Sequence, residues 1–262
     1  MTPVRGIADY TFVRPLGSGN HGHYYLATTP ARLPVEAGHV AVKVLAAEST
    51  SAAFRRATRE LTAFAAVRSP YLVAPYDAGQ HDGIFYYATE YLDGGSLADP
   101  VEPGVGLRAV AHAARAAAAL HGAGIAHRDI KPGNVLLHAD GAKVSDLGLS
   151  HVFAEGVTLT GMGSMASAEY TDPGVLHGEP PGPAGDVWSL GVLLHRVVAG
   201  TGLYGELPAD DGLFVLRRIL STAPVVSAGL PEPVAALVRD CLGPVVERPS
   251  AETVADRIDA LR

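Results

Sequence analysis

The chain has 262 residues, of which 48% are hydrophobic and 18% are charged, and its formal net charge is −7. A chain of this length and composition can bury a sizeable core in one large domain or two lobes, and it is not a disordered polymer. The negative net charge argues against nucleic acid as a partner, because a nucleic-acid footprint requires a basic face.

Two further features bear on the compartment of the protein. Cys241 is the only cysteine, which excludes an internal disulfide and suits a reducing compartment. No apolar run reaches the ~18–20 residues of a membrane span, and residues 1–10 lack the apolar core of a secretory signal. We therefore expect a cytoplasmic protein with no membrane span in this chain.

A glycine-rich stretch, Gly17–Gly22, lies between two predicted strands, Tyr10–Leu16 and His23–Ala27. Glycines in such a hairpin let the backbone come close to a phosphate, with free N–H groups pointing at the anion. A Rossmann-type dinucleotide site would need a helix directly after the glycines. The strand that follows disfavours that alternative and favours a phosphate-binding hairpin.

A lysine stands inside the next predicted strand, His39–Leu45, which is otherwise mostly apolar. Burying Lys43 is costly unless it is paired, and a helix predicted over Thr50–Val67 supplies Glu60 as its natural partner. In the alternative interpretation Lys43 extends outward from a strand edge and Glu60 pairs with Arg56 one turn away. The apolar face of the helix is expected to contain Phe54, Leu61, Phe64 and Ala65.

The middle of the chain changes from strand signals to helix signals. Two strands are predicted over Tyr71–Tyr76 and Ile84–Tyr91, with their turn at Gly79–Gly83. A flexible connector, Leu92–Ser96, follows, and we place the boundary between two lobes there. Several prolines and glycines then delay the next helix, which is predicted over Leu107–His121.

A polar loop, His127–Asn134, follows that helix. It offers a carboxylate (Asp129), an amine (Lys131) and an amide (Asn134), and its Pro–Gly pair excludes a regular helix. Such a loop between ordered segments is typical of a catalytic site, with a chance polar turn as the alternative. A short predicted hairpin after it leads to Asp146.

The last part of the chain is expected to be largely helical. Ser150–Glu169 has no clear period and is predicted to be an irregular loop. Helices are predicted from Asp186 to about Val198, over Pro233–Cys241 and over Ser250–Leu261. The whole pattern predicts an α+β fold, with a small β-rich lobe that has one main helix and a larger, mostly helical lobe.

Together these pieces contain what phosphoryl transfer requires. The glycine hairpin can cradle phosphates, and Lys43 can supply a fixed cation. Asn134 and Asp146 offer oxygen ligands suited to Mg²⁺. Asp129 offers a carboxylate for the hydroxyl nucleophile, and Lys131 can neutralise charge that grows on the transferring group.

In this order, the motifs resemble the signature of the eukaryotic-like (Hanks-type) Ser/Thr protein kinases of bacteria. The resemblance rests on Gly17–Gly22, Ala41–Lys43, Glu60, His127–Asn134, Asp146–Gly148, Asp186–Trp188 and Arg248–Pro249. It covers about Tyr10–Leu261 and implies one bilobal protein-kinase domain over residues 1–262. The implied N-lobe is about 1–91, the hinge about 89–93 and the C-lobe about 94–262.

The resemblance also implies roles for individual residues. The catalytic residues would be Asp129, Lys131, Lys43 and Glu60, and the metal ligands would be Asn134 and Asp146. The nucleotide would be bound by Gly17, Ser18, Gly19, Gly22, Ala41, Lys43, Glu90, Leu92 and Leu136, with Thr89 as gatekeeper. The implied cofactors are ATP and Mg²⁺ or Mn²⁺, and the implied partner is a protein with a Ser or Thr acceptor.

Regulation is implied by the same resemblance. In having an arginine, Arg128, directly before the catalytic aspartate, the chain resembles kinases that are controlled by phosphorylation of the activation loop. The candidate sites in this chain are Thr158, Thr160 and Ser164. Autophosphorylation of the loop would involve a transient dimer.

The sequence departs from the family pattern at four places. Leu147 replaces a phenylalanine, Tyr24 stands where a small valine usually caps adenine, and the helix after the hinge looks shortened. Gly174 stands where the family has a glutamate, which normally pairs with the arginine that matches Arg248. The candidate substitutes for that glutamate are Asp172, Glu179 and Glu247.

Two other classes of function are the alternatives. The unusual segment Ser150–Gly174 suggests a pseudokinase or a nucleotide-binding regulatory scaffold. A small-molecule kinase of the aminoglycoside or choline type would share the catalytic aspartate and asparagine. Lys131 and the Asp186–Trp188 helix disfavour the second alternative, because small-molecule kinases usually lack both.

Overall fold

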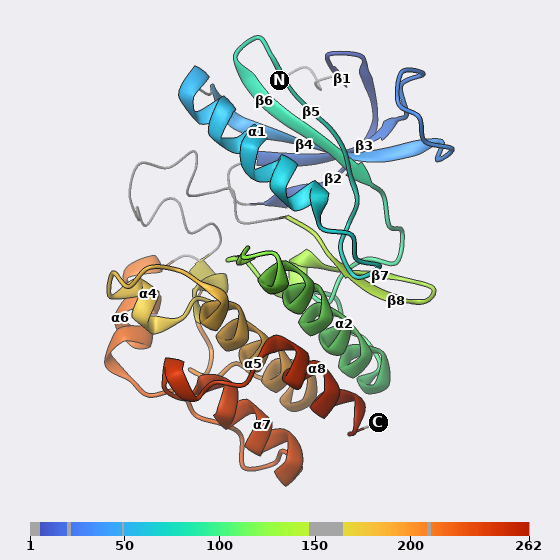
Figure 1. Cartoon of the computed structure of the whole chain (residues 1–262). Helices are drawn as coiled ribbons and strands as arrows, with labels where there is room; N and C mark the ends of the chain where they lie inside the picture. Colours follow the sequence, from blue (N-terminus) through green and yellow to red (C-terminus); the bar gives the residue numbers. More distant parts are fainter. Residues whose placement is uncertain (1–5, 20–21, 49, 147–164, 209–210, 262) are drawn as a thin grey trace. The chain divides into compact units, whose positions relative to one another are not determined.

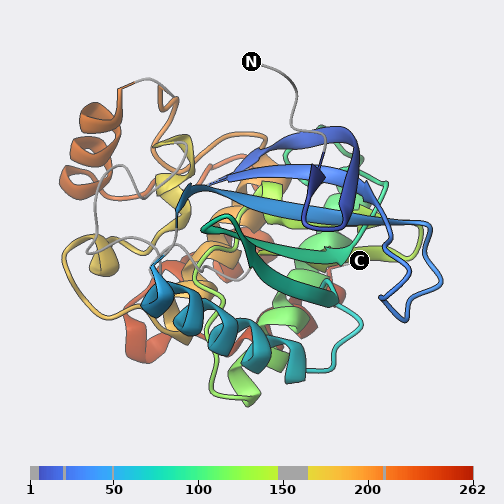
Figure 2. The ribbon, with the colours of Figure 1, turned by 90° about the horizontal axis from the view of Figure 1, so that it is seen from above.

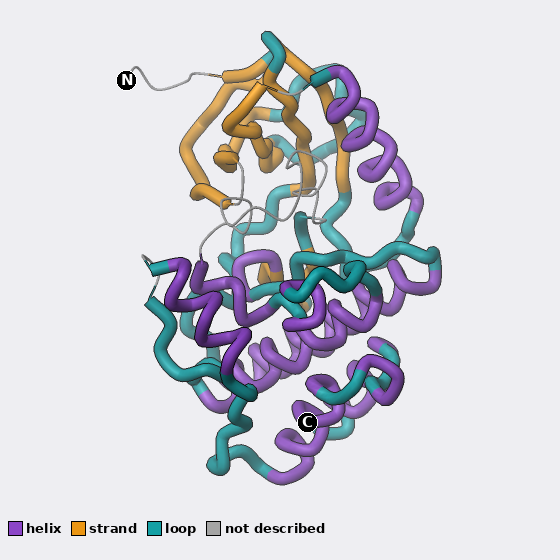
Figure 3. Tube along the Cα trace, turned by 90° about the vertical axis from the view of Figure 1, so that its left-hand side faces the viewer, coloured by secondary structure: helices purple, strands orange, loops and turns teal. Residues whose placement is uncertain are grey.

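The computed structural model describes residues 6–19, 22–48, 50–146, 165–208 and 211–261. These residues divide into two compact units. The first, here called the sheet unit, contains the described residues up to Ala66 together with Val73–Tyr91. The second, the helical unit, contains Val67–Leu72 and the described residues from Leu92 onward. Figure 3 shows most of the strands in the first unit and most of the helices in the second.

The sheet unit is built on one six-stranded antiparallel sheet in the order β1-β2-β3-β4-β6-β5. Its strands are β1 (Gly6–Ile7), β2 (Tyr10–Gly19), β3 (Gly22–Thr28), β4 (His39–Glu48), β5 (Pro75–His81) and β6 (Ile84–Glu90). One helix, α1 (Ser51–Ala66), runs beside the sheet (Figure 2). Phe54 of this helix meets Phe85 edge-on, with 5.7 Å between the ring centroids.

Alternation along the strands separates the two faces of this sheet. One face carries an apolar core made of Ile7, Tyr10, Ala27, Leu33, Val40, Val42, Tyr86 and Ala88. Because successive side chains of a strand point to opposite faces, Ala41 and Lys43 belong to the other face. The pattern of β4 thus separates Lys43 from this core.

The apolar face of α1 differs from the prediction at two residues. Ala57, Leu61 and Phe64 are buried, whereas Ala65 is exposed. Ala57 lies one turn before Leu61 and belongs to the buried stripe in place of Ala65, while Phe54 is half-buried.

The predicted strand Tyr71–Tyr76 is misplaced. The strand begins at Pro75 and runs through Gly79 to His81. The hairpin turns on Asp82 and Gly83 alone, whose φ angles are 48° and 79°. A two-residue turn with two positive φ angles matches the twist of its flanking strands, so the pairing extends up to the turn.

The helical unit contains α2 (Pro103–Gly122), α4 (Pro173–Leu176), α5 (Pro183–Ala199), α6 (Gly212–Ser221), α7 (Glu232–Leu242) and α8 (Ala251–Asp259). Short 3₁₀ helices are η1 (Pro132–Asn134), η3 (Met165–Tyr170) and η4 (Val245–Glu247), and β7 (Val135–His138) pairs with β8 (Gly141–Val144). α2 packs against both α5 and α8, and α5 packs against α7 (Figure 1). None of the described helices is long and apolar enough to cross a membrane.

The first turn of α2 shows how tertiary packing overrides local signals. The helix begins at Pro103 rather than at Leu107. Pro103 occupies the first turn, where a missing N–H is tolerated. Gly106 is needed because an added Cβ would lie 2.5 Å from Cγ1 of Val197. Residues 91–102 contain no helix, which agrees with the expected shortening after the hinge.

The predicted irregular loop Ser150–Glu169 is only partly described. Its last residues form η3, contrary to the prediction, and two hydrogen bonds from α5 stabilise that turn. Trp188 Nε1 donates to the carbonyl of Glu169 at 3.2 Å, and Ser189 Oγ donates to the carbonyl of Tyr170 at 2.7 Å. The candidate phosphorylation sites and Leu147 lie outside the described residues.

Candidate active site

The glycine hairpin is formed by β2 and β3 in the sheet unit. Gly17 pairs with Tyr24, Ser18 with His23, and Gly19 with Gly22. Two of these glycines are required by the sheet itself. An added Cβ on Gly22 would lie 2.3 Å from the carbonyl oxygen of Val44, and Gly17 has a φ of 148°.

Lys43 lies between two tyrosines on neighbouring strands. The register places it opposite Tyr24 on β3 and opposite Tyr87 on β6. Its Nζ is 4.8 Å from the ring centroid of Tyr24 and 5.8 Å from that of Tyr87. Both distances fall within the range of about 6 Å for cation–π attraction, so the two rings help to hold the ammonium group. Neither contact was predicted from the sequence.

The remaining residues expected at the nucleotide also take defined places. Ala41 pairs with Thr89, on the same face of the sheet as Lys43, and Glu60 is half-buried on α1. The Glu90 carboxylate accepts a hydrogen bond from the Ala74 N–H at 2.7 Å. Leu136 lies on β7 of the helical unit, and Leu92 is the first residue of the second segment of that unit.

The three loop residues predicted to be catalytic or metal-binding are in contact in the helical unit. Lys131 Nζ is 2.9 Å from each carboxylate oxygen of Asp129. Asn134 Nδ2 donates to Oδ2 of Asp129 at 2.9 Å and to the Asp129 carbonyl at 2.8 Å. The Asp129 side chain is nevertheless 27% exposed. The carboxylate is therefore held in one orientation and stays accessible.

Asn134 and Asp146 have the donor chemistry of a magnesium site. Because the amide nitrogen of Asn134 is bonded to Asp129, its amide oxygen is the atom available to a metal. Ser145 connects the two residues: its N–H donates to the Asn134 carbonyl at 2.8 Å, and its hydroxyl lies 3.3 Å from Oδ2 of Asp146. Mg²⁺ favours one or two such protein oxygens when phosphates complete its shell, so these residues fit the ion.

Asp186, buried in the first turn of α5, holds the backbone of the loop. Its carboxylate accepts hydrogen bonds from the N–H groups of His127 at 2.8 Å and Arg128 at 2.7 Å. His121 Nε2 lies 2.8 Å from the same carboxylate. Arg128 has a φ of 69°, a left-handed conformation that is costly for a residue with a side chain. The bonds to Asp186 stabilise that conformation, a role that the sequence did not reveal.

His127 is a structural member of the loop. It is fully buried, its Nε2 donates to the Ser145 carbonyl at 3.0 Å, and its Nδ1 accepts from the Asp129 N–H at 3.3 Å. Burial lowers the pKa of His127, although the neighbouring Asp186, Asp129 and Asp146 oppose this shift. One donating and one accepting nitrogen define a neutral imidazole.

Of the three candidate partners for Arg248, Asp172 is the one that pairs with it. The two side chains form an ion pair in which both are more than nine-tenths buried, at 6% and 8% exposed. Glu179 is exposed, and its carboxylate lies over Gly174, where an added Cβ would be 2.6 Å from Oε2. Glu247 is also exposed. The residue that pairs with Arg248 thus lies two positions before Gly174, the position at which the resemblance implied a glutamate.

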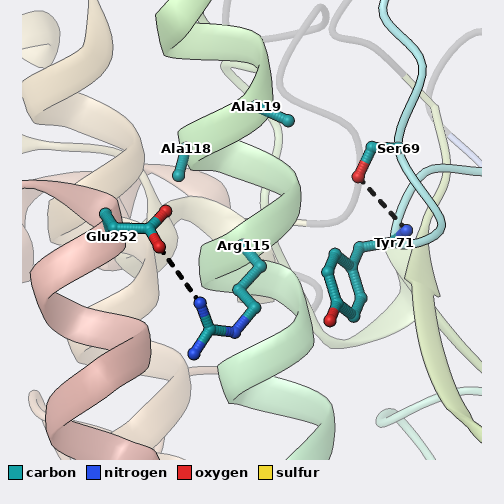
Figure 4. Close-up of a pocket in the computed structure, with 6 residues that line it drawn as sticks. All are labelled: Ser69, Tyr71, Arg115, Ala118, Ala119 and Glu252. Atoms are coloured by element: carbon teal, nitrogen blue, oxygen red, sulfur yellow. Dashed lines mark hydrogen bonds and ion pairs between the residues drawn. The ribbon is translucent and has the colours of Figure 1, made fainter.

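The helical unit also has a pocket of about 360 Å³ (Figure 4). On one side of it Arg115 bonds to Glu252 at 3.1 Å. The lining residues are Ser69, Tyr71, Arg115, Ala118, Ala119 and Glu252. None of them is an expected catalytic, nucleotide-binding or metal-binding residue, so this pocket is separate from the site described above.

Comparison with known proteins identifies the class. The protein kinase domain family matches residues 10–256. The crystal structure of the Mycobacterium tuberculosis PknI kinase domain has a TM-score of 0.73 at 24% identity and covers 99% of both chains. This likeness confirms the expected fold, with a β-rich part and a larger helical part. The chain belongs to the protein kinase domain family.

Two bacterial relatives are named serine/threonine-protein kinases. Serine/threonine-protein kinase PknJ of Mycobacterium tuberculosis is 33% identical over 237 residues, which is 86% of this chain and 39% of the relative. Serine/threonine-protein kinase PknB of Mycobacterium leprae is 34% identical over 175 residues, which is 62% of this chain and 28% of the relative. The chain thus spans less than half the length of these relatives.

Proposed function

We propose that this chain transfers the γ-phosphoryl group of Mg-ATP to a serine or threonine hydroxyl of a protein, including residues of its own activation loop. The observation that carries the proposal is the Asp129 carboxylate, bonded by Lys131 and Asn134 and still 27% exposed, in a chain of the kinase family. A nucleophile-orienting carboxylate needs this combination of fixed geometry and access.

In this mechanism the helical unit acts on the acceptor hydroxyl. Asp129 orients the hydroxyl and accepts its proton as the new P–O bond forms, while the bond from the γ-phosphorus to the β,γ-bridging oxygen of ATP breaks and ADP leaves. Lys131 holds the Asp129 carboxylate in place and neutralises charge on the transferring group. Asn134 and Asp146 would hold the Mg²⁺, which supplies further charge neutralisation when it is bound.

The sheet unit acts on the nucleotide. The glycine hairpin covers the phosphates, and Lys43, fixed between two tyrosine rings, bonds to them, with Glu60 as its partner. Ala41 and Thr89 lie on the same face of the sheet as Lys43, and in this proposal they contact the adenine. Glu90, Leu92 and Leu136 are the other residues proposed to contact it. A cytoplasmic location is part of the proposal, because the reaction consumes ATP.

The proposal is tested by incorporation of labelled phosphate from Mg-ATP into the chain and into myelin basic protein. Asp129→Asn should lower incorporation by about 10²–10⁴-fold, the usual contribution of such a group. Asp140→Asn, at an exposed turn between β7 and β8, is the matched control and should behave like the wild type. Incorporation that is absent from the wild type, or equal in Asp129→Asn, would contradict the proposal.

The same samples separate the alternatives and locate the modification. Stabilisation against heat by Mg-ATP without turnover would identify a nucleotide-binding scaffold. Mass spectrometry of the incubated wild type should find phosphate on Thr158, Thr160 or Ser164, and incorporation that rises with the square of protein concentration would indicate a transient dimer.

A further inference from the structure

Through two backbone carbonyls and a ring, Arg248 contacts two separate segments of the helical unit, α5 and the end of α7. Its Nε donates to the carbonyl of Gly243 at 2.9 Å, and its Nη1 donates to the carbonyl of Ala184 at 2.8 Å. The guanidinium carbon lies 5.4 Å from the ring centroid of Trp188. Carbonyls and a ring satisfy donors but do not neutralise the charge of a buried guanidinium, which needs a carboxylate.

Asp172 provides that carboxylate and has a second task. Its Oδ2 pairs with Arg248, while its Oδ1 accepts the N–H of Gly174 at 2.9 Å and so caps α4. Among the described residues no other carboxylate pairs with Arg248. One side chain therefore fixes the start of α4 and joins it to the arginine.

The segment anchored in this way is connected to the catalytic loop through α5. Trp188 and Ser189 bond to the carbonyls of Glu169 and Tyr170, and Asp186 on the same helix bonds to the backbone of the catalytic loop. Asp186 precedes Trp188 by two residues and Ser189 by three residues on α5. Because both segments are bonded to α5, the helix fixes the position of residues 165–176 relative to the loop that carries Asp129.

We propose that Asp172 is a positioning residue for the protein substrate, which through Arg248 holds residues 165–176 in register with Asp129. This inference rests on the proposed kinase function. It assigns to Asp172 the place that the family gives to a glutamate at position 174. The chain can use glycine at that position because the Glu179 carboxylate occupies the adjoining space.

Asp172→Asn separates the two tasks of the residue. The amide oxygen of asparagine still caps α4, but the charge opposite Arg248 is lost. We expect kcat/KM for myelin basic protein to fall about tenfold or more, since a displacement of about 1 Å near a reacting group costs up to ~10²-fold. The KM for ATP should stay within about twofold, because the residues that bind ATP lie elsewhere. Glu179→Ala and Glu247→Gln are matched acidic controls and should resemble the wild type.

A charge-relocation variant completes the test. Asp172→Ala combined with Gly174→Glu and Glu179→Ala returns the carboxylate to the family position and removes the side chain that would block it. This variant should recover most of the lost kcat/KM for the protein substrate. If Asp172→Asn does not fold, the relocation variant should fold and phosphorylate, and its failure would overturn the inference.

Other outcomes also decide the matter. An unchanged kcat/KM in Asp172→Asn, an equal loss in either control, or a parallel rise in the KM for ATP would each overturn the role of Asp172. A wild-type protein that incorporates no phosphate would instead refute the proposed function. The two failures are therefore distinguishable.

Discussion

The candidate site residues of the sheet unit and those of the helical unit are held by different physical means. Lys43 is placed by strand register, which sets it between Tyr24 and Tyr87 on one face of a regular sheet. Asp129 lies on an irregular loop that is not part of a backbone hydrogen-bond ladder. The conformation of this loop depends on side-chain hydrogen bonds, above all those of Asp186. The conformation of a sheet is stabilised by many backbone hydrogen bonds, whereas the conformation of the loop is stabilised by a few buried side chains. Single substitutions should therefore damage the loop more than the strand.

The largest effect is expected for Asp186→Asn. The amide cannot accept the N–H groups of both His127 and Arg128, and hydrogen bonds to a charged acceptor contribute about 1.5–3 kcal/mol each. We expect the free energy of unfolding to fall by about 3 kcal/mol in urea titrations, and phosphate incorporation to fall at least ~100-fold. A variant with nearly wild-type stability and activity would show that the loop does not depend on α5.

A smaller effect is expected from titration of His127. Its pKa is lowered in the folded protein, so around and below pH ~6.5 this residue binds more protons in the unfolded chain than in the folded chain. Its contribution to stability is present above pH ~6.5 and is lost as the pH falls toward the lowered pKa. The unfolding free energy should therefore be lower at pH 5.5 than at pH 7.5.

The control for this titration is His127→Asn, which does not ionise. Its unfolding free energy should be lower than that of the wild type at pH 7.5, and the difference should shrink at pH 5.5. A difference that stays constant or grows on acidification would show that His127 is not the neutral, buried group described above.

For the sheet half of the site, Tyr24→Leu should have a moderate effect. Loss of one cation–π contact of about 0.5–1 kcal/mol should raise the KM for ATP about two- to fivefold, as measured by initial rates. Tyr24→Phe keeps the ring and should match the wild type. Equal effects of both substitutions would mean that the hydroxyl, and not the ring, matters at this position.

The smallest effect is expected in the sheet unit away from the site. Arg32 bonds to Asp9 at 2.7 Å and also pairs with Asp77, but its side chain is 43% exposed. Arg32→Ala should lower the unfolding free energy by about 0.5–1 kcal/mol at low salt, less at high salt, with unchanged phosphate incorporation. A loss comparable to that of Asp186→Asn would remove the contrast between the two regions.

How much could be predicted from the sequence depended on distance along the chain. Asp129, Lys131 and Asn134 are close in sequence, so their contacts follow from one local loop. The ends of elements were less well predicted, since Pro75 and Pro103 begin their elements for reasons of pairing and packing that a local pattern does not contain. The bond from Asp186 to Arg128 joins residues 58 positions apart and has no local signal.

The sequence by itself determined the class of fold, the order of the motifs and the chemistry of each candidate residue, because periodicity and residue type are local properties. Only the tertiary structure decided which carboxylate neutralises Arg248, which rings flank Lys43 and which residue holds the loop that carries Asp129. From the sequence alone, three acidic residues were equally suitable partners for Arg248. Burial made the choice, since a buried guanidinium is stable only beside the one carboxylate that the fold brings into contact with it, Asp172.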